Sequence, residues 1–144
     1  MTGQFAYELM LRRKDSGKEV SQDLEDAIMK DAYYAFRYAQ DHIGRSERVE
    51  QAILSYVGQG DSSIALWYAQ EVIKGIWTEA ESIIAKNKYD AFRYVRDCTD
   101  SSNIDMVTDC IHKSAFSGSP ALRKDYIQLL KARNVDFNKI IDFV

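Results

Sequence analysis

The sequence predicts an all-α protein, built as a stack of short helical hairpins like an α-solenoid, with about ten helices. Three observations support this prediction. A five-residue motif occurs three times, a similar apolar segment precedes each copy, and residues that break helices are scarce. The motif reads AFRYA at 35–39, ALWYA at 65–69 and AFRYV at 91–95.

The segment before each motif completes a unit of two short helices. It reads EDAI at 25–28, EQAI at 50–53 and ESII at 81–84. A helix pair of this size cannot bury its own apolar face, so neighbouring pairs must stack. We therefore expect Phe36, Leu66 and Phe92 to fill equivalent positions in successive hairpins.

Length and composition indicate one helical-repeat domain over residues 1–144. The chain is 46% hydrophobic and 28% charged, which is ordinary for a globular protein. One proline and seven glycines are too few for the many turns of a sandwich or barrel. The repeats cover roughly 20–98, and 100–144 are expected to form divergent helices that serve as a cap or as a specialised binding surface.

Charge and cysteine content narrow the function classes. The net charge of −3 makes duplex nucleic acid an unfavourable partner, because such binding depends on neutralising phosphates. Cys98 and Cys110 could pair, but a core of this size needs no disulfide, so we expect a reduced, cytoplasmic protein. No apolar run is long enough to span a bilayer, so we expect no membrane association.

Capping residues and apolar spacing set the expected helices of the first half. The first helix is expected at about 3–13. Ser21 is placed to cap a short helix, and Asp31 to cap a helix that reaches Ile43 and ends with Gly44 in the left-handed conformation. Ser46 then restarts the chain, and the next helix is expected to break at 58–60.

The same signals continue through the second half. Asp61 is expected to cap the helix of the second motif, which closes at Gly75. Capping boxes are predicted at 78–81 and 102–105. The remaining starts are Asn87, which opens the third motif, and Ser119 followed by Pro120 at the first position of a long helix. A last short helix is expected around 137–143.

The motifs support one family resemblance. The wording AFRYA at 35–39, together with IKGIWTEAE at 73–81, resembles short tandem helical repeats found in many bacteriophage proteins. The resemblance covers roughly 20–98 and implies a phage or prophage origin. It supplies no catalytic residue and no established activity.

The sequence contains no convincing catalytic or metal-binding pattern. Structural zinc needs two close ligand pairs, and Cys98, Cys110 and His112 do not form them, so we expect the cysteines in the core and no metal or cofactor. His42 and His112 are expected near helix ends, where they meet the helix dipole. The acidic residue that opens each repeated segment is expected to stabilise a helix start. These residues are Glu25, Glu50 and Glu81.

Comparing equivalent positions of the repeat points to contact residues. Trp67 stands where the other copies have Arg37 and Arg93, on the side of the helix away from the apolar stripe. Tryptophan and arginine dominate binding hot spots, although Trp67 could instead simply cover a neighbouring helix pair.

Other aromatic residues have mainly structural interpretations. The tyrosine common to all three copies, at positions 38, 68 and 94, is expected to fill the seam between repeats with its hydroxyl pointing outward, rather than to stack on bases. Trp77 is expected to pack at the helix start that follows it.

These observations predict a protein–protein interaction module with no chemistry of its own. Its surface is expected to include Arg37, Trp67, Arg93, Arg96 and Tyr34. The family resemblance suggests a phage factor that takes over or inhibits a host protein, for example a defence protein. The alternatives are single-stranded nucleic-acid binding, an enzyme whose residues come from distant repeats, and self-association through an uncapped end.

Overall fold

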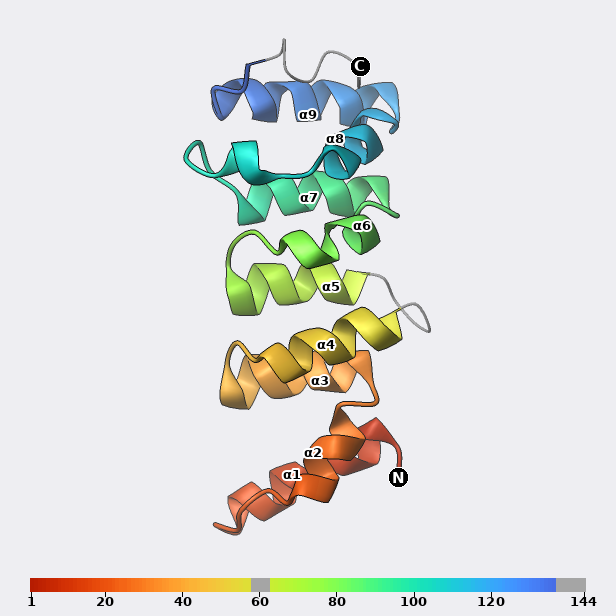
Figure 1. The fold of residues 1–144 in the computed structure, drawn as a ribbon, viewed down its shortest axis with the longest axis vertical. Coiled ribbons are helices and arrows are strands. Elements are labelled where there is room, and N and C mark those ends of the chain that lie inside the picture. Colours follow the sequence, from red (N-terminus) through yellow and green to blue (C-terminus); the bar gives the residue numbers. More distant parts are fainter. Residues whose placement is uncertain (58–62, 137–144) are drawn as a thin grey trace. The chain divides into compact units, whose positions relative to one another are not determined.

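The computed structural model describes residues 1–57 and 63–136, and every regular element in these ranges is helical (Figure 1). This confirms the predicted all-α class. The chain divides into two compact units, Met1–Ile64 and Ala65–Val144. The single-domain assignment stays a prediction.

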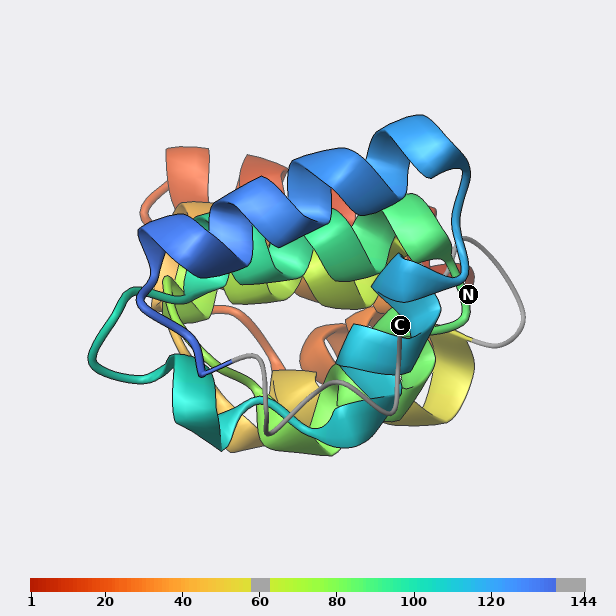
Figure 2. The same cartoon turned by 90° about the horizontal axis from the view of Figure 1, so that it is seen from above.

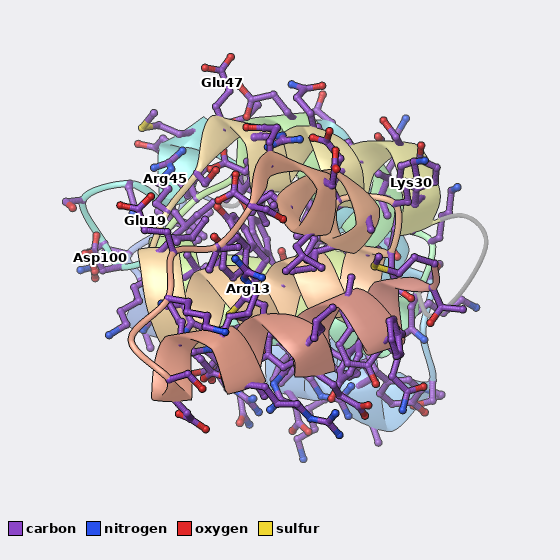
Figure 3. The ribbon with its side chains drawn as sticks, turned by 90° about the horizontal axis from the view of Figure 1, so that it is seen from below. Arg13, Glu19, Lys30, Arg45, Glu47 and Asp100 are labelled. Atoms are coloured by element: carbon purple, nitrogen blue, oxygen red, sulfur yellow. The ribbon has the colours of Figure 1, made fainter. Side chains whose placement is uncertain are left out.

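Unit 1 consists of two helix pairs. α1 (Gly3–Asp15) packs against α2 (Gln22–Ile28), and α3 (Ala32–Tyr38) packs against α4 (Glu47–Tyr56), while α1 also touches α3. The turn after α1 is closed by Arg13, whose Nε donates to the carbonyl oxygen of Glu19 at 3.0 Å. Figure 3 labels both residues. The core of this unit contains Ala6, Met10, Leu24, Ile28, Ala35, Phe36, Tyr38, Val49 and Ile53.

Unit 2 receives most of α5 (Ser63–Tyr68) and continues through shorter helices. These are α6 (Glu81–Ile84), α7 (Lys88–Cys98), α8 (Asp109–Phe116) and α9 (Pro120–Ala132), with single 3-10 turns at Thr78–Ala80 and Ile104–Met106. α8 packs on α6, α7 and α9, and α9 also lies along α7 (Figure 2). The core of this unit contains Leu66, Tyr68, Trp77, Ile84, Tyr94, Val95, Ile111, Phe116, Tyr126 and Leu130.

Most predicted helix starts are confirmed by side-chain caps. Ser21, Asp31 and Ser46 each accept a hydrogen bond from the backbone amide three residues later. Asn87 and Ser119 do the same at the starts of α7 and α9, and Pro120 stands at the first position of α9. A cap of this kind satisfies one of the amides that the first turn leaves free, which explains why these starts are readable from sequence.

The first two motif copies end in the same unusual way. Both helices widen into a π-helical turn, Ala39–Ile43 and Ala69–Ile73. Gly44 has a positive φ of 72°, but its ψ of −161° lies outside the left-handed helical region that we predicted. In the second copy the inserted Lys74, not Gly75, takes the left-handed conformation. Ile43 is exposed, because the widened turn carries it off the buried stripe.

A tyrosine–glutamate bridge joins two consecutive helices in each unit, α2 to α3 in unit 1 and α6 to α7 in unit 2. The Tyr38 hydroxyl donates to Glu25 Oε1 at 2.6 Å, and the Tyr94 hydroxyl donates to Glu81 Oε2 at 2.5 Å. Both tyrosines are buried with the hydroxyl turned inward, so the predicted outward orientation is wrong. Burial raises the pKa of Tyr38 and of Tyr94, and the neighbouring carboxylate acts in the same direction.

The second carboxylate oxygen of each glutamate connects the pair to a third helix. Glu25 Oε2 accepts from Arg48 of α4 at 3.3 Å, whereas Glu81 Oε1 accepts from the Thr108 amide, just before α8, at 2.7 Å. Glu25 and Glu81 do lie in the first turns of their helices, as predicted. The sequence gives no sign of their hydroxyl partners.

Both predicted capping boxes are wrong. Thr78 lies in a 3-10 turn without a side-chain cap, and Glu81 has its carboxylate engaged by Tyr94 and Thr108 instead. At 102–105 the chain makes a 3-10 turn, and Ser102 bonds back to Asp100 rather than capping a helix. In each place, a side chain that the capping box would use for a backbone amide of its own helix makes a different hydrogen bond. Glu81 bonds to two distant groups, and Ser102 bonds within its loop.

Three predicted features fall on residues that the structure does not describe. The break at 58–60, the cap at Asp61 and the last helix around 137–143 lie outside the described residues. Among the helices that are described, none is both long and apolar enough to cross a bilayer.

His112 lies in the middle of α8 and is buried, so its predicted place at a helix end is wrong. Its Nδ1 shares a hydrogen bond of 2.6 Å with the Tyr126 hydroxyl. Burial lowers the pKa of His112, and Asp109 opposes this shift. His42 stays in the last turn of its helix, as expected.

We expect Tyr94→Phe to lower the free energy of unfolding by about 1–3 kcal/mol. The change removes the hydroxyl that serves both the carboxylate of Glu81 and the amide of Trp77. Tyr38→Phe is the matched control and should cost about 1 kcal/mol or less, because Glu25 is only half-buried whereas Glu81 is buried. Urea unfolding followed by circular dichroism measures both, and equal losses would contradict the importance of burial.

We expect stability to decrease as the pH falls below about 6.5, the pKa of an unfolded histidine. The folded pKa of His112 is lowered, so the unfolded chain binds more protons in this range and stability is complete only above it. Each such group contributes at most about 1.4 kcal/mol per pH unit. His112→Gln should flatten the pH profile of urea unfolding; His42→Gln separates the share of His42, whose pKa is also lowered by burial. A profile unchanged by His112→Gln would overturn the assignment.

Candidate functional site

A groove of about 340 Å³ lies between α7 and the start of α9 in unit 2. Figure 2 shows these two helices running alongside each other. The groove contains two of the five predicted contact residues. Its lining is Tyr89, Phe92, Arg93 and Arg96 from α7, with Ser119, Ala121, Leu122 and Asp125 from the other side.

The spacing of residues along α7 explains the groove wall. Positions 89, 92, 93 and 96 are related as i, i+3, i+4 and i+7, so they share one face of the helix. The opposite face carries Ala91, Tyr94, Val95 and Cys98, all buried. One helix therefore serves the core and the groove at once.

Aromatic and aliphatic side chains form the floor. The Phe92 ring meets the buried Tyr126 ring edge-on, with centroids 6.2 Å apart, and Leu122 is buried beside α7. Tyr89 is 54% exposed at the groove. Phe92 is only half-buried, unlike Phe36 and Leu66, so the third copy differs from its siblings by facing this groove.

Charges of both signs surround this floor. Arg96 donates from Nε and Nη2 to Asp97 at 2.8 and 2.9 Å, and its guanidinium carbon lies 5.8 Å from the Phe92 ring centroid. The hydrogen bonds with Asp97 raise the pKa of Arg96, and Arg96 lowers the pKa of Asp97. Arg93 Nη1 donates at 3.2 Å to Asp90, which is 2% exposed. Asp125 adds a carboxylate to the lining.

The other predicted contact residues do not line this groove. Trp67 lies half-buried on α5 of the same unit. Arg37 and Tyr34 belong to α3 in unit 1 and are both half-buried. One surface made of all five residues stays a prediction, while sequence reasoning missed Tyr89 and Asp125.

Arg37 occupies an aromatic cluster of its own in unit 1. Its guanidinium carbon lies 5.6 Å from the Tyr7 ring centroid and 5.9 Å from that of Tyr33. Its Nη1 donates to the Tyr33 hydroxyl at 3.1 Å and its Nε to Asp41 at 3.3 Å. The Tyr33 hydrogen bond is the main cause that raises the pKa of Arg37. Tyr34 completes the cluster, edge-on to Tyr33 at 5.0 Å.

His42 borders this cluster and contacts two other titratable side chains. Its Nε2 is 3.5 Å from the Tyr7 hydroxyl, and its Nδ1 is 3.3 Å from Lys14 Nζ. Burial lowers the pKa of His42, followed by repulsion from Lys14. The Tyr7 hydroxyl donates to Asp41, and burial followed by this bond raises the Tyr7 pKa. These groups bond to one another, and the absence of enzymatic activity stays a prediction.

The cysteines carry no reactive or metal-binding signature. Burial raises the pKa of Cys98 to about 12, which keeps its thiol protonated. Cys98 is in the core as predicted, whereas Cys110 is half-buried with Sγ 3.1 Å from Thr108 Oγ1. Within the described ranges no group of three histidine, cysteine or acidic residues is arranged to hold a metal ion.

Comparisons of the chain with protein-family models, with curated proteins and with solved structures find no match.

Proposed function

We propose that this chain is a non-enzymatic protein-binding module, and that the α7/α9 groove receives a short segment of another protein. The observation that carries the proposal is the combination of an apolar floor, formed around Phe92 and Leu122, with charges of both signs at Arg93, Arg96 and Asp125. Peptide segments that bind in grooves usually place an apolar anchor among polar contacts.

The side chains of the groove suit a binding hot spot. Tyrosine and arginine are enriched among residues that dominate interfaces. Arg96 is already held by Asp97 and by the Phe92 ring, so binding immobilises little that was free beforehand. Tyr89 combines an exposed ring with few rotatable bonds, which makes it the best single anchor for a partner.

The same charges argue against single-stranded nucleic acid as the ligand. A strand-binding surface needs aromatic platforms together with uncompensated positive charge. Here Arg93 and Arg96 are each paired with a carboxylate, and Asp125 would repel phosphates. The net charge of −3 adds to this repulsion.

We further propose that the partner is a bacterial host protein and that the chain acts as a phage accessory factor in the host cytoplasm. This part of the proposal rests on the resemblance of 35–39 and 73–81 to phage helical repeats. Inhibition of the partner, for example a defence protein, is the expected consequence if the groove covers a functional segment of it.

A photo-crosslinking amino acid in place of Tyr89 tests the groove directly in bacterial cells that express the chain. We expect a discrete adduct with one protein, weakened about tenfold or more when Arg96→Ala is added, because loss of a hot-spot side chain costs at least about 1–2 kcal/mol of binding. The same cross-linker in place of Lys124, which is exposed on α9 outside the groove, is the matched control and should give no such adduct.

Other outcomes would contradict the proposal. An adduct that nuclease shortens would identify nucleic acid as the ligand, and one of twice the chain mass would identify a second copy of the chain. Equal yields from positions 89 and 124 would show that the groove has no special role. Tyr89→Ala should change the free energy of unfolding by no more than about 0.5 kcal/mol, because the side chain is mostly exposed.

A further inference from the structure

A second cavity, separate from the groove, lies where α6, α8 and the start of α7 meet in unit 2. Its volume is about 400 Å³. The lining supplies three lysines and no acidic side chain, although the chain as a whole has a net charge of −3. The lining residues are Ser82, Ala85, Lys86, Lys88, Cys110, Lys113, Ser114 and Ser117.

Two of these lysines have no partner in the described part of the chain. The ammonium groups of Lys86 and Lys88 make neither an ion pair nor a hydrogen bond there, and the Ser82 hydroxyl makes no hydrogen bond there. Lys113 brings a third positive charge to the same cavity from α8. A cavity lined by lysines and by no carboxylate suits an anionic ligand.

A purely structural role for these lysines would be to cap carbonyl groups at helix ends. Three carbonyls at this cavity already have donors. Ser114 Oγ donates to the carbonyl oxygen of Ala85 at 2.6 Å, and Ser117 Oγ donates to that of Ser114 at 2.7 Å. The Ser117 amide donates to the carbonyl oxygen of Lys113 at 3.1 Å. Capping therefore does not account for Lys86 and Lys88.

We propose that this cavity binds a phosphate group, either as free phosphate or as part of a small phosphomonoester. Lysine ammonium groups serve as point charges for phosphate oxygens, and the Ser82 hydroxyl can donate to a further oxygen. Lys88 is the first residue of α7, so the positive end of that helix lies beside the site. The cavity is larger than one phosphate requires and has room for a small organic body.

Titration of the ¹⁵N-labelled full chain with inorganic phosphate and with O-phospho-L-serine tests this site. We expect saturable shifts of amide signals confined to 82–88 and 110–117. The double variant Lys86→Gln and Lys88→Gln should weaken binding about fivefold or more, since two charge contacts are lost. Lys124→Gln with Lys131→Gln is the matched control: it changes the net charge equally, on exposed positions of α9 outside the cavity, and should leave binding unchanged.

The two ligands identify the source of the phosphate group. Comparable affinities would assign the site to the free anion, and clearly tighter binding of O-phospho-L-serine would assign it to a phosphomonoester. If both double variants weakened phosphate binding equally, the binding would be due to general charge attraction, and the proposal would be overturned. So would the lack of saturation by either ligand, or shifts spread over the whole chain. All four lysines are exposed, and circular dichroism confirms that the variants fold.

Discussion

The buried carboxylate of Glu81 is the constraint on which unit 2 depends. An isolated charge in the core would be strongly destabilising, so every donor around it must be held in place. One donor comes from Tyr94 on α7 and the other from the backbone before α8, and together they fix three helices against each other. Unit 1 repeats the arrangement with Glu25, Tyr38 and Arg48, but nearer to water. The two units thus share a tyrosine–glutamate hydrogen bond as well as an apolar stripe.

The sequence allowed the helical class and most helix starts to be predicted, because both depend on neighbours in the chain. Caps such as Asp31 and Asn87 act on an amide three residues away, and the apolar stripe has a short period. The capping box at Glu81 was wrong because two distant donors take its carboxylate. A local pattern cannot show that competition. The same limit explains why the tyrosine hydroxyls were expected to point outward.

The groove contains two of the residues that the comparison of repeats singled out, and their role as contact residues stays a prediction. Arg93 was singled out together with Arg37, because Trp67 replaces arginine at the equivalent position of the second copy, and Arg96 lies one turn beyond Arg93. Tyr89 completes the same helical face and could have been found from its spacing to these two residues. Asp125 could not, because only tertiary structure brings α9 to α7. A comparison of repeats finds residues on the repeated helix and misses the opposite wall, which lies outside the repeat.

Each of the two candidate binding sites of unit 2 has one wall from the repeated sequence and one wall from the divergent sequence that follows it. In the groove, α7 of the third motif faces α9; in the cationic cavity, α6 and the start of α7 face α8. The repeated helices are constrained by the core and by the hydrogen bonds of Glu81, so one wall of each site is rigid. The opposite walls come from 119–125 in the groove and from 110–117 in the cavity, and both segments lie outside the repeated motif. The side chains that the two proposals use as anchors, Tyr89 and Arg96 in the groove and Lys86 and Lys88 in the cavity, lie on the repeated side. We therefore expect the repeated side to anchor a ligand and the opposite wall to determine which ligand fits.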